Sequence, residues 1–447
     1  MNREASESCA ARGWRAAFVS HRAARDPGTG FSLWRMPFLT ALLFMTMPAV
    51  AGAQAAPPPV DGDSAAGASL RVFLMTIGQG DYIFERFGHN AIWIRDEKTG
   101  RDVAWNYGIF DFEQPGYIGR LVRGDMRYWV ESYDANVLAR HYQDSNRTVM
   151  VQELNLTPSR KAGLRDFLEW NEQEEHRYYR YDYYRDNCST RVRDALDRAV
   201  DGQLRHTLEA IPTETTYRSH TQRLLVDRIP AATGTLLGLG PATDVPLDAW
   251  ETAFLPVQFM QQIRDLRVSR PDGSVVPLVL GGSTVFQADR APEATLAPDR
   301  LLFYLATGIA LGGLAWLLGR GEGSGRVAIA FAVFGGVIML AIGIFGSIIA
   351  YLWLFTDHSF TYRNENVLQA NPFALVAGGL LLLGTFGRAR AAARVAVLVV
   401  AALAVLGFVL QVLPGIDQSN GSIIGLLLPF HLGMALGVVS DERDRRL

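Results

Sequence analysis

The pattern of apolar residues divides the chain near residue 300. Beyond that point lie five apolar runs, at 301–318, 327–355, 373–386, 395–412 and 423–439. A helix that spans a bilayer needs about 20 apolar residues, with a lower limit near 17. The first, second and fourth runs meet this requirement clearly, whereas the third is short and the fifth contains Pro429 and His431. We therefore expect a bundle of about five transmembrane helices over 298–440.

Before residue 300 the pattern is that of a mixed α+β domain over 69–297. Three segments have the length and apolar content of strands, at 69–76, 91–95 and 102–107. A periodic, charged stretch over 158–175 predicts an amphipathic helix. A second helix is predicted over 189–200, with Asp186 and Asn187 supplying its N-cap. Residues 55–68 are rich in Pro, Ala, Gly and Ser, which predicts a flexible linker.

Arginine residues mark one side of the predicted bundle. They lie between the first two runs, between the third and fourth, and after the fifth, at Arg320, Arg326, Arg388, Arg390, Arg394, Arg443, Arg445 and Arg446. The other two loops, 356–372 and 413–422, carry one arginine between them. Because positively charged loops stay in the cytoplasm, we expect the tail over 441–447 inside the cell and the residues before 300 outside the cytoplasm.

Residues 1–54 predict a leader and a secretory signal. Arg35 precedes an apolar stretch over 36–53 that closes with small residues, as in a signal peptide cleaved near Ala53. A true start of translation at Met36 is a further hypothesis, and an uncleaved anchor is the alternative to cleavage. A cleaved signal peptide and an uncleaved anchor both place the domain on the periplasmic side of a bacterial inner membrane, in agreement with the arginine distribution.

Composition and motifs exclude several classes of function. The net charge of −2 gives no basic excess that would indicate nucleic-acid binding. The sequence contains no Gly-x-Ser-x-Gly, no Walker loop and no dinucleotide fingerprint. One cysteine with scattered histidines has no zinc-ligand spacing. We therefore expect no metal, no cofactor and no nucleic-acid partner.

Cys188 is expected to be the only cysteine of the mature protein, because Cys9 lies upstream of the predicted signal. A lone thiol outside the cytoplasm cannot form an intramolecular disulfide, so it is reactive, paired with another chain, or inert and buried. Cys188 lies in the first turn of the predicted helix, and Arg185 and Arg191 flank it. A helix N-terminus and nearby positive charge both favour a thiolate nucleophile.

His89 is the leading candidate for the base that such a nucleophile needs. It follows Gly88 at the start of a predicted strand, and papain-like hydrolases pair a Cys-bearing helix with a His-bearing strand. Because the histidine here precedes the cysteine, a circularly permuted version of that fold is implied. Asn106 is the first choice for the residue that orients the imidazole, with Asp111 second. An inert buried cysteine and an ordinary core histidine are the alternatives. Four other histidines rank lower as bases: His141, His176, His206 and His220.

Several motifs, in the same order along the chain, resemble one family. They are Phe87-Gly88-His89-Asn90-Ala91, the segment 105–112, the segment 184–191, Thr216-Tyr217-Arg218, the segment 250–256, and a loop with Asp357, His358, Asn364, Asn366 and Asn371. Together they resemble the Lnb-type periplasmic domain (DUF4105) and its membrane half. The resemblance implies a lipoprotein N-acyltransferase with a permuted papain-like, NlpC/P60-related thiol domain. It further implies Cys188 as nucleophile and His89 as base.

The resemblance also implies the partners. A phospholipid in the inner membrane would donate the acyl chain, and the α-amino group of a diacylglyceryl-cysteine on a lipoprotein would accept it. Residues expected to bind substrate or support the site are Gly88, Asn90, Asp111, Tyr184, Asp186, Asn187, Thr190, Arg191, Asp357 and His358. Two alternatives stay open: a membrane-tethered cysteine peptidase or amidase of the envelope, and a non-enzymatic membrane protein with a sensory outer domain.

Overall fold

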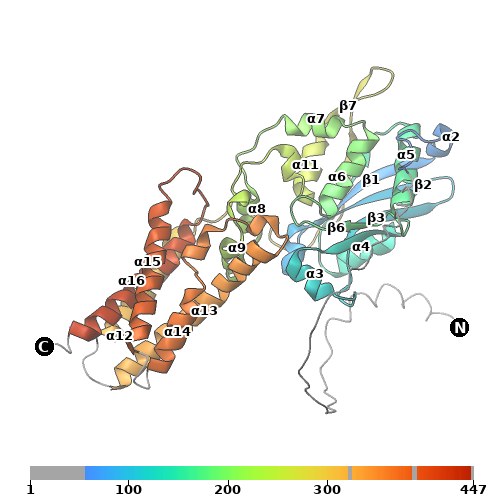
Figure 1. The fold of residues 1–447 in the computed structure, drawn as a ribbon. Helices are drawn as coiled ribbons and strands as arrows, with labels where there is room; N and C mark the ends of the chain where they lie inside the picture. Colours follow the sequence, from blue (N-terminus) through green and yellow to red (C-terminus); the bar gives the residue numbers. More distant parts are fainter. Residues whose placement is uncertain (1–55, 321–324, 385–389, 444–447) are drawn as a thin grey trace, which may run out of the picture.

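The computed structural model describes residues 56–320, 325–384 and 390–443. The predicted leader and signal peptide, and the last residues of the predicted tail, lie outside these ranges. The described chain forms a sheet-containing domain followed by a bundle of long helices (Figure 1). The expected mixed fold with five candidate transmembrane helices is confirmed. The permuted papain-like relationship stays a prediction.

A seven-stranded antiparallel sheet forms the centre of the first domain. Its order is β6-β4-β3-β2-β1-β5-β9. The strands are β1 (Leu70–Ile77), β2 (His89–Asp96), β3 (Arg101–Ile109), β4 (Arg127–Asp134), β5 (Val149–Leu154), β6 (Tyr178–Arg180) and β9 (Val279–Phe286), with a separate hairpin of β7 (Arg267–Ser269) and β8 (Val275–Pro277). The three predicted strands correspond to β1, β2 and β3.

Helices cover both faces of this sheet. Successive residues of β1, such as Leu74 and Met75, belong to two different buried clusters. This is expected, because successive side chains of a strand point to opposite faces of the sheet. The first face packs against α5 (Pro158–Asn171) and α6 (Cys188–Ala199), and the second packs against α4 (Ala135–Asp144). The two predicted helices correspond to α5 and α6. The continuous apolar character of β1 is therefore explained by burial on both sides.

The structure corrects the prediction of a flexible linker over residues 55–68. Residues 56–68 do not extend freely but pack on α5 and include the short helix α2 (Ser64–Gly67). The backbone N–H of Gly62 donates to the carbonyl of Ser159 at 2.9 Å. A Cβ on Gly163 would lie 1.9 Å from the carbonyl oxygen of Val60, so only glycine permits this approach. The small residues that suggested flexibility thus allow close backbone packing.

Five short helices follow α6 and are called the helical lobe, although three of them pack into the same buried core as α5 and α6. They are α7 (Gln203–Glu209), α8 (Tyr217–Leu224), α9 (Ile229–Gly238), α10 (Ala249–Thr252) and α11 (Pro256–Arg264). Figure 1 shows α8 and α9 next to the bundle and α11 next to the sheet. The lobe therefore links the two halves of the molecule.

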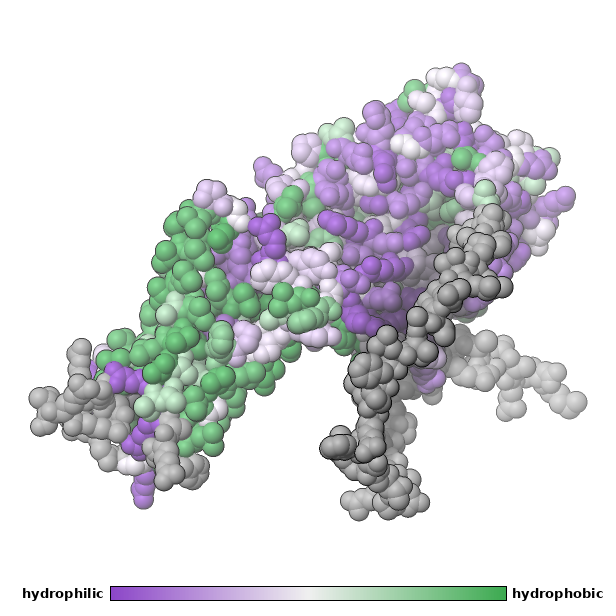
Figure 2. All heavy atoms as spheres, in the orientation of Figure 1, coloured by the Kyte–Doolittle hydropathy of each residue, from purple (hydrophilic) through white to green (hydrophobic). Residues whose placement is uncertain are grey.

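The bundle contains α12 (Leu301–Gly319), α13 (Gly325–Phe355), α14 (Phe373–Gly384), α15 (Arg390–Leu410) and α16 (Gly421–Arg443). Five segments are long and apolar enough to cross a membrane, including the third over Glu365–Gly384 and the fifth over Gly421–Ser440. Glycines let α12 and α16 approach closely, since a Cβ on Gly312 would lie 2.2 Å from the carbonyl oxygen of Pro429. Figure 2 shows apolar residues over the outside of the bundle and mostly polar residues over the sheet domain.

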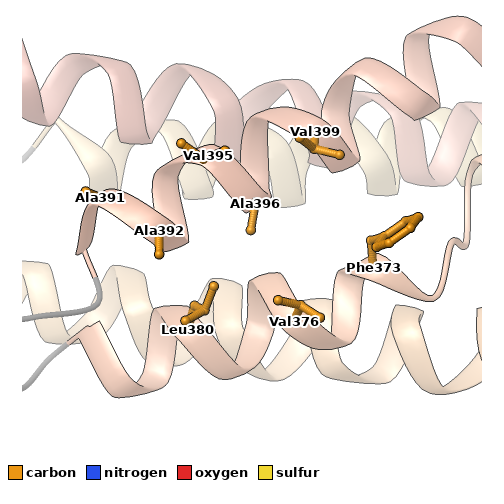
Figure 3. Close-up of a pocket in the computed structure, with 8 residues that line it drawn as sticks. All are labelled: Phe373, Val376, Leu380, Ala391, Ala392, Val395, Ala396 and Val399. Atoms are coloured by element: carbon orange, nitrogen blue, oxygen red, sulfur yellow. The ribbon is translucent and has the colours of Figure 1, made fainter.

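An apolar groove of about 550 Å³ separates α14 from α15 (Figure 3). Its lining consists of Phe, Val, Leu and Ala side chains only, among them Phe373 and Val399. It offers no titratable group or hydrogen-bond donor, so it does not supply an active site. Lipid chains would fill such a groove in a bilayer.

Side-chain amides join the bundle to the lobe. Asn364 and Asn366 donate to the carbonyls of Leu237 and Leu236, each at 2.8 Å, and Gln418 donates to the carbonyl of Leu239 at 3.0 Å. These carbonyls end α9, where the last turn of a helix has no partners of its own. Two of the asparagines that resemble the family's membrane half, Asn364 and Asn366, therefore have a clear structural role: they dock α9 on the bundle.

Candidate active site

Cys188 is the first residue of α6, and its position is fixed by a helix cap. The side chain of Asn187 accepts hydrogen bonds from the backbone N–H groups of Ser189 and Thr190, at 2.8 and 3.0 Å. Thr190 completes the capping box by accepting from the N–H of Asn187 at 2.8 Å. The predicted supporting residues Asn187 and Thr190 thus hold the first turn of the helix in place.

Gly108 lets β3 pass beside the cysteine. The strand is irregular between Tyr107 and Ile109, and Gly108 has φ +89°, a backbone conformation that favours glycine. A Cβ on Gly108 would lie 3.3 Å from Cβ of Cys188. The start of α6 therefore meets the sheet at this bulge, two residues beyond Asn106 on the same strand.

His89 and Asn106 come from neighbouring strands and are hydrogen-bonded. His89 begins β2 and Asn106 lies in β3, and Nε2 of the imidazole contacts Oδ1 of the amide. An amide oxygen only accepts, so Nε2 carries the ring proton and Nδ1 keeps a free lone pair. Asn106 is buried, with 4% of its surface exposed. The geometry selects Asn106 over Asp111 as the partner of the imidazole.

Asn90 connects the histidine strand to the cysteine helix. Its side chain donates from Nδ2 to Oγ of Ser189 at 3.0 Å, and both residues are fully buried. Its backbone N–H and that of Ser189 lie close enough to the sulfur of Cys188 to lower the pKa of the thiol. The residues that follow His89 and Cys188 are therefore bonded to each other, which brings the two reactive side chains to one junction.

The thiol and the imidazole are both uncharged at neutral pH. Burial raises the pKa of the Cys188 thiol to about 11, although the amides of Asn90 and Ser189 oppose this. Burial, followed by the positive charge of Arg147, lowers the pKa of His89 to about 4. Both residues nevertheless remain partly exposed to solvent. The site therefore holds a neutral pair and not a thiolate–imidazolium pair.

This charge state corrects the expectation of a resting thiolate. Arg191 is bound to the carboxylate of Asp186, at 2.5 and 2.6 Å, so its charge is largely neutralised locally. The guanidinium of Arg185 lies 4.8 Å from the ring centre of Phe360, against the membrane half. The two arginines flank the cysteine in sequence but are engaged elsewhere, and burial of the sulfur outweighs the helix N-terminus.

Tyr142 and Arg147 complete the surroundings of the imidazole. The ring centre of Tyr142, from α4, lies 6.0 Å from that of His89. Arg147 lies over the Tyr142 ring at 5.0 Å, is 4% exposed, and donates from Nε to the carbonyl of Gly78 at 3.0 Å. Sequence reasoning missed both residues, because no local motif marks a side chain that only the fold brings to the site.

Tyrosine side chains surround the sulfur on its other side. Burial, and then a negative charge on Cys188, raise the pKa values of Tyr179 and Tyr181 well above their ordinary range. The hydroxyl of Tyr179 is buried and has no hydrogen-bond partner within the ranges that the structure describes. The tyrosine-rich segment 178–184 thus places an unpaired hydroxyl, that of Tyr179, near the thiol.

Other residues proposed from the sequence lie away from the thiol. Asp111 is exposed and accepts from the N–H of Glu113 at 2.8 Å, so it shapes a turn. Tyr184 is buried among Tyr217 and Phe360 and bonds to Thr221 at 2.7 Å. Gly88 has φ +81° and forms the turn that leads into His89.

The alternative base His220 is bonded to neighbours in the helical lobe. It contacts the hydroxyl of Thr215 and the guanidinium of Arg223, each at 3.0 Å. Burial, and then the charge of Arg223, lower its pKa to about 3. His176 stacks on Trp170, with ring centres 4.0 Å apart. Both histidines therefore contact residues other than the thiol and have a structural role.

Asp357 and His358 lie where the membrane half meets the sheet domain. The N–H of Asp357 donates to the carbonyl of Arg123 at 2.7 Å, and Nε2 of His358 contacts the carbonyl of Leu121 at 2.9 Å. Both border a polar cavity of about 250 Å³ whose wall also includes Tyr181. The structure thus brings them close to the surroundings of Cys188 from a distant part of the sequence.

A metal site is not evident among the described residues, where no group of three or more His, Cys, Asp or Glu side chains could hold an ion. The chemistry of the site rests on the thiol, the imidazole, the Asn106 amide and the surrounding backbone N–H groups.

Two family models match this chain. The Lnb N-terminal periplasmic domain matches residues 62–223, which include Cys188, His89 and Asn106, and the Lnb transmembrane domain matches residues 327–439. Together they cover more than half of the chain. A search of curated proteins and a search of solved structures each gave no match. The chain therefore belongs to the Lnb-type family and is an inner-membrane protein with a periplasmic N-terminal domain.

Proposed function

We propose that this protein is a thiol acyltransferase that moves an acyl chain from a phospholipid to the α-amino group of diacylglyceryl-cysteine on lipoproteins. One observation carries the proposal: Cys188 begins a helix beside a hydrogen-bonded His89–Asn106 pair, in a periplasmic domain docked on membrane helices. Both substrates lie in the same membrane as the enzyme. A membrane-docked thiol suits them better than it suits a soluble peptide.

The first step forms a thioester. The sulfur of Cys188 attacks the ester carbonyl of the phospholipid while its proton passes to Nδ1 of His89. Because burial lowers the pKa of His89 to about 4, its imidazole is unprotonated at neutral pH and Nδ1 can accept this proton, but the same low pKa makes it a weak base. Because the pKa of the thiol is about 11, the proton leaves during the attack and not before it.

Backbone amides would stabilise the negative charge of the tetrahedral intermediate. The N–H groups of Asn90 and Ser189 already lie close to the sulfur, and so does the free Tyr179 hydroxyl. Preorganised donors of this kind are worth about 10²–10³ in rate each. Collapse of the intermediate breaks the carbon–oxygen bond, and the imidazolium returns its proton to the departing lysophospholipid oxygen.

The second step resolves the thioester. The uncharged α-amino group of the diacylglyceryl-cysteine attacks the thioester carbonyl and gives one proton to His89. The carbon–sulfur bond breaks, the amide forms, and the thiolate recovers the proton from the imidazolium. An α-amino group has a pKa of about 7.7–8.0, so a sufficient fraction is uncharged at neutral pH.

The proposed catalytic unit is the region 69–297, and the remainder anchors it. With the sheet domain in the periplasm and five spans, the C-terminus would lie in the cytoplasm, in agreement with the arginine-rich loops. Asp357 and His358 would then act at the periplasmic end of α13, where they would support the substrate or the site.

Complementation tests the proposal directly. A strain depleted of its essential lipoprotein N-acyltransferase would express the wild type, Cys188→Ala or the control Cys9→Ser. Mass spectrometry of lipoprotein N-termini is the measurement. We expect triacylated lipoproteins with the wild type and the control only, at equal membrane abundance of all three.

Two other results would contradict the proposed function. If well-inserted wild type left lipoproteins diacylated, the acyltransferase activity would be wrong, and cleavage of peptides or amides would be tested next. Full rescue by Cys188→Ala would instead indicate a function that does not use the thiol.

A further inference from the structure

We infer that helix α3 (Tyr117–Arg123) and the aromatic residues around it form a second membrane contact, which delivers the donor's acyl chain to Cys188. This inference rests on the proposed function for the delivery step, but the membrane contact itself stands on geometry. The occupant is the outer leaflet of the inner membrane, and the chain delivered is that of a phospholipid.

The position of α3 relative to the bundle is the first support. The residues that follow α13 bond to the end of α3, through the N–H of Asp357 and the carbonyl of Arg123 at 2.7 Å. Gly124, directly after α3, packs against the backbone of His358. Helix α13 is a candidate span that ends at Phe355, so α3 lies next to the end of a helix that is expected to cross the bilayer. Figure 1 shows α3 on the side of the sheet domain that faces the bundle.

Exposed apolar side chains are the second support. Ile118 and Val122 are 66% and 42% exposed, and their spacing of four puts them on one face of α3. Phe112, in the loop before the helix, is 57% exposed. Exposed apolar patches of this kind mark interaction surfaces. Arg123, also exposed, lies on the same short helix and suits the phosphate groups of a lipid surface.

A second exposed group lies beside the first. Tyr82, Ile83 and Phe84 surround the start of the short helix η1 (Ile83–Phe87) and are all exposed. The ring of Phe84 meets that of Phe110 at 6.4 Å between centres. Tyrosine and other aromatic side chains are favoured at the level of lipid head groups. The two groups together form one apolar edge that is continuous with the membrane half.

A row of rings leads from this edge to the thiol. Ring centres are 4.9 Å apart for Phe112 and Phe110, 4.9 Å for Phe110 and Tyr128, and 4.2 Å for Tyr128 and Tyr181. Tyr181 and Cys188 both pack against the large buried cluster on the first face of the sheet. An acyl chain that leaves the bilayer would meet aromatic surface, and not water, until its carbonyl reaches the sulfur.

Lipid quenching tests the membrane contact without any need for activity. The full chain, with Cys9→Ser and Cys188→Ala, would carry Ile118→Cys labelled with a thiol-reactive fluorophore in vesicles of brominated phospholipid. The control is Val275→Cys, whose side chain is 52% exposed in the β7–β8 hairpin, at the end of the domain away from the bundle (Figure 1). We expect strong quenching at position 118 and none at 275. Equal fluorescence at both positions would overturn the contact.

Acyl transfer tests the delivery step. We expect Ile118→Asp with Val122→Asp to lower transfer from bilayer phospholipid about tenfold or more, because the edge would no longer enter the lipid. Transfer from the same phospholipid dispersed in detergent should stay near wild type, and Val275→Asp should change neither. If Ile118→Asp with Val122→Asp transferred acyl chains from bilayer phospholipid at the wild-type rate, the delivery step would be contradicted. If the wild type transfers no acyl chain but position 118 is quenched, the proposed function falls and the membrane contact stands.

Discussion

At the scale of single residues, the site combines a thiol that resists ionisation with an imidazole that resists protonation. Residue type and position single out Cys188, His89 and Asn106 as candidates, because a lone cysteine at a helix start and a histidine at a strand start are local features. Their charge states were not predictable from the sequence. The side chains that bury the sulfur and the imidazole come from α4, β6 and the segment before β5, far apart along the chain.

Alkylation of Cys188 measures its charge state. With Cys9→Ser, the rate of reaction with iodoacetamide should be low at pH 7 and rise toward an inflection near pH 11, because only the thiolate is a strong nucleophile. The same reagent with a free model thiol, whose pKa is about 8.5, is the reference. An inflection below that of the model thiol would show that the helix N-terminus outweighs burial.

Arg147 should tune both groups. Its charge lowers the pKa of His89 and that of Cys188, so Arg147→Met should raise both. The acid limb of the transfer activity, set by protonation of His89, would then move to higher pH, and the alkylation inflection would also rise. The partly exposed pair of Arg165 with Asp166 offers a control, since Arg165→Met removes a comparable charge away from the site. Equal pH profiles for the two variants would exclude this role.

At the scale of elements, periodicity located most of what surrounds the site. The pattern predicted β1, β2, β3, α5 and α6, each within a few residues of its observed bounds. It did not predict that β9, from the end of the domain, pairs with β5, or that β3 bulges at Gly108. Pairing between distant strands and local irregularities depend on tertiary packing, which a single pattern does not contain.

The bulge gives a prediction with an internal control. Gly108 and Gly100 both have positive φ, +89° and +73°, so alanine costs about 1–3 kcal/mol of backbone strain at either position. Only at Gly108 would the new Cβ press on Cys188, since nothing lies within 4 Å at Gly100. We expect Gly108→Ala to reduce acyl transfer far more than Gly100→Ala at similar melting temperature. Equal activities would mean that the approach of β3 does not position the thiol.

At the scale of the whole molecule, the two halves behave as one unit because polar contacts join them. Asn364, Asn366 and Gln418 satisfy the last carbonyls of α9, and Asp244 of the lobe pairs with Arg218 at 2.7 Å while accepting from the N–H of Ser419 at 3.2 Å. The sequence predicted the two halves from hydropathy alone. It did not predict this joint, since amides in loops have many possible partners.

Loss of these amides should loosen the joint. Asn364→Ala with Gln418→Ala would remove one hydrogen bond each from the carbonyls of Leu237 and Leu239, which keep bonds from Asn366 and Arg218, at a cost of about 0.5–1.5 kcal/mol each. We expect a lower first transition in thermal unfolding of the detergent-solubilised protein and faster proteolysis near α9. Asn136→Ala, at an exposed position of α4, is the control and should behave as the wild type. A single unchanged transition in the double variant would mean that other contacts hold the halves together.

The amide joint has a consequence for the choice of acceptor. Because α9 is fixed to the bundle, Cys188 works at a constant height above the lipid surface and does not swing outward on a tether. Under the proposed function, an acceptor would therefore have to carry its modified cysteine to that height while its lipid tails stay in the membrane. The folded body of the lipoprotein then has to stand clear of the sheet domain. The length of unstructured chain after the first residue would thus determine whether the modified cysteine reaches Cys188. Lipoproteins with a short spacer would be poor acceptors.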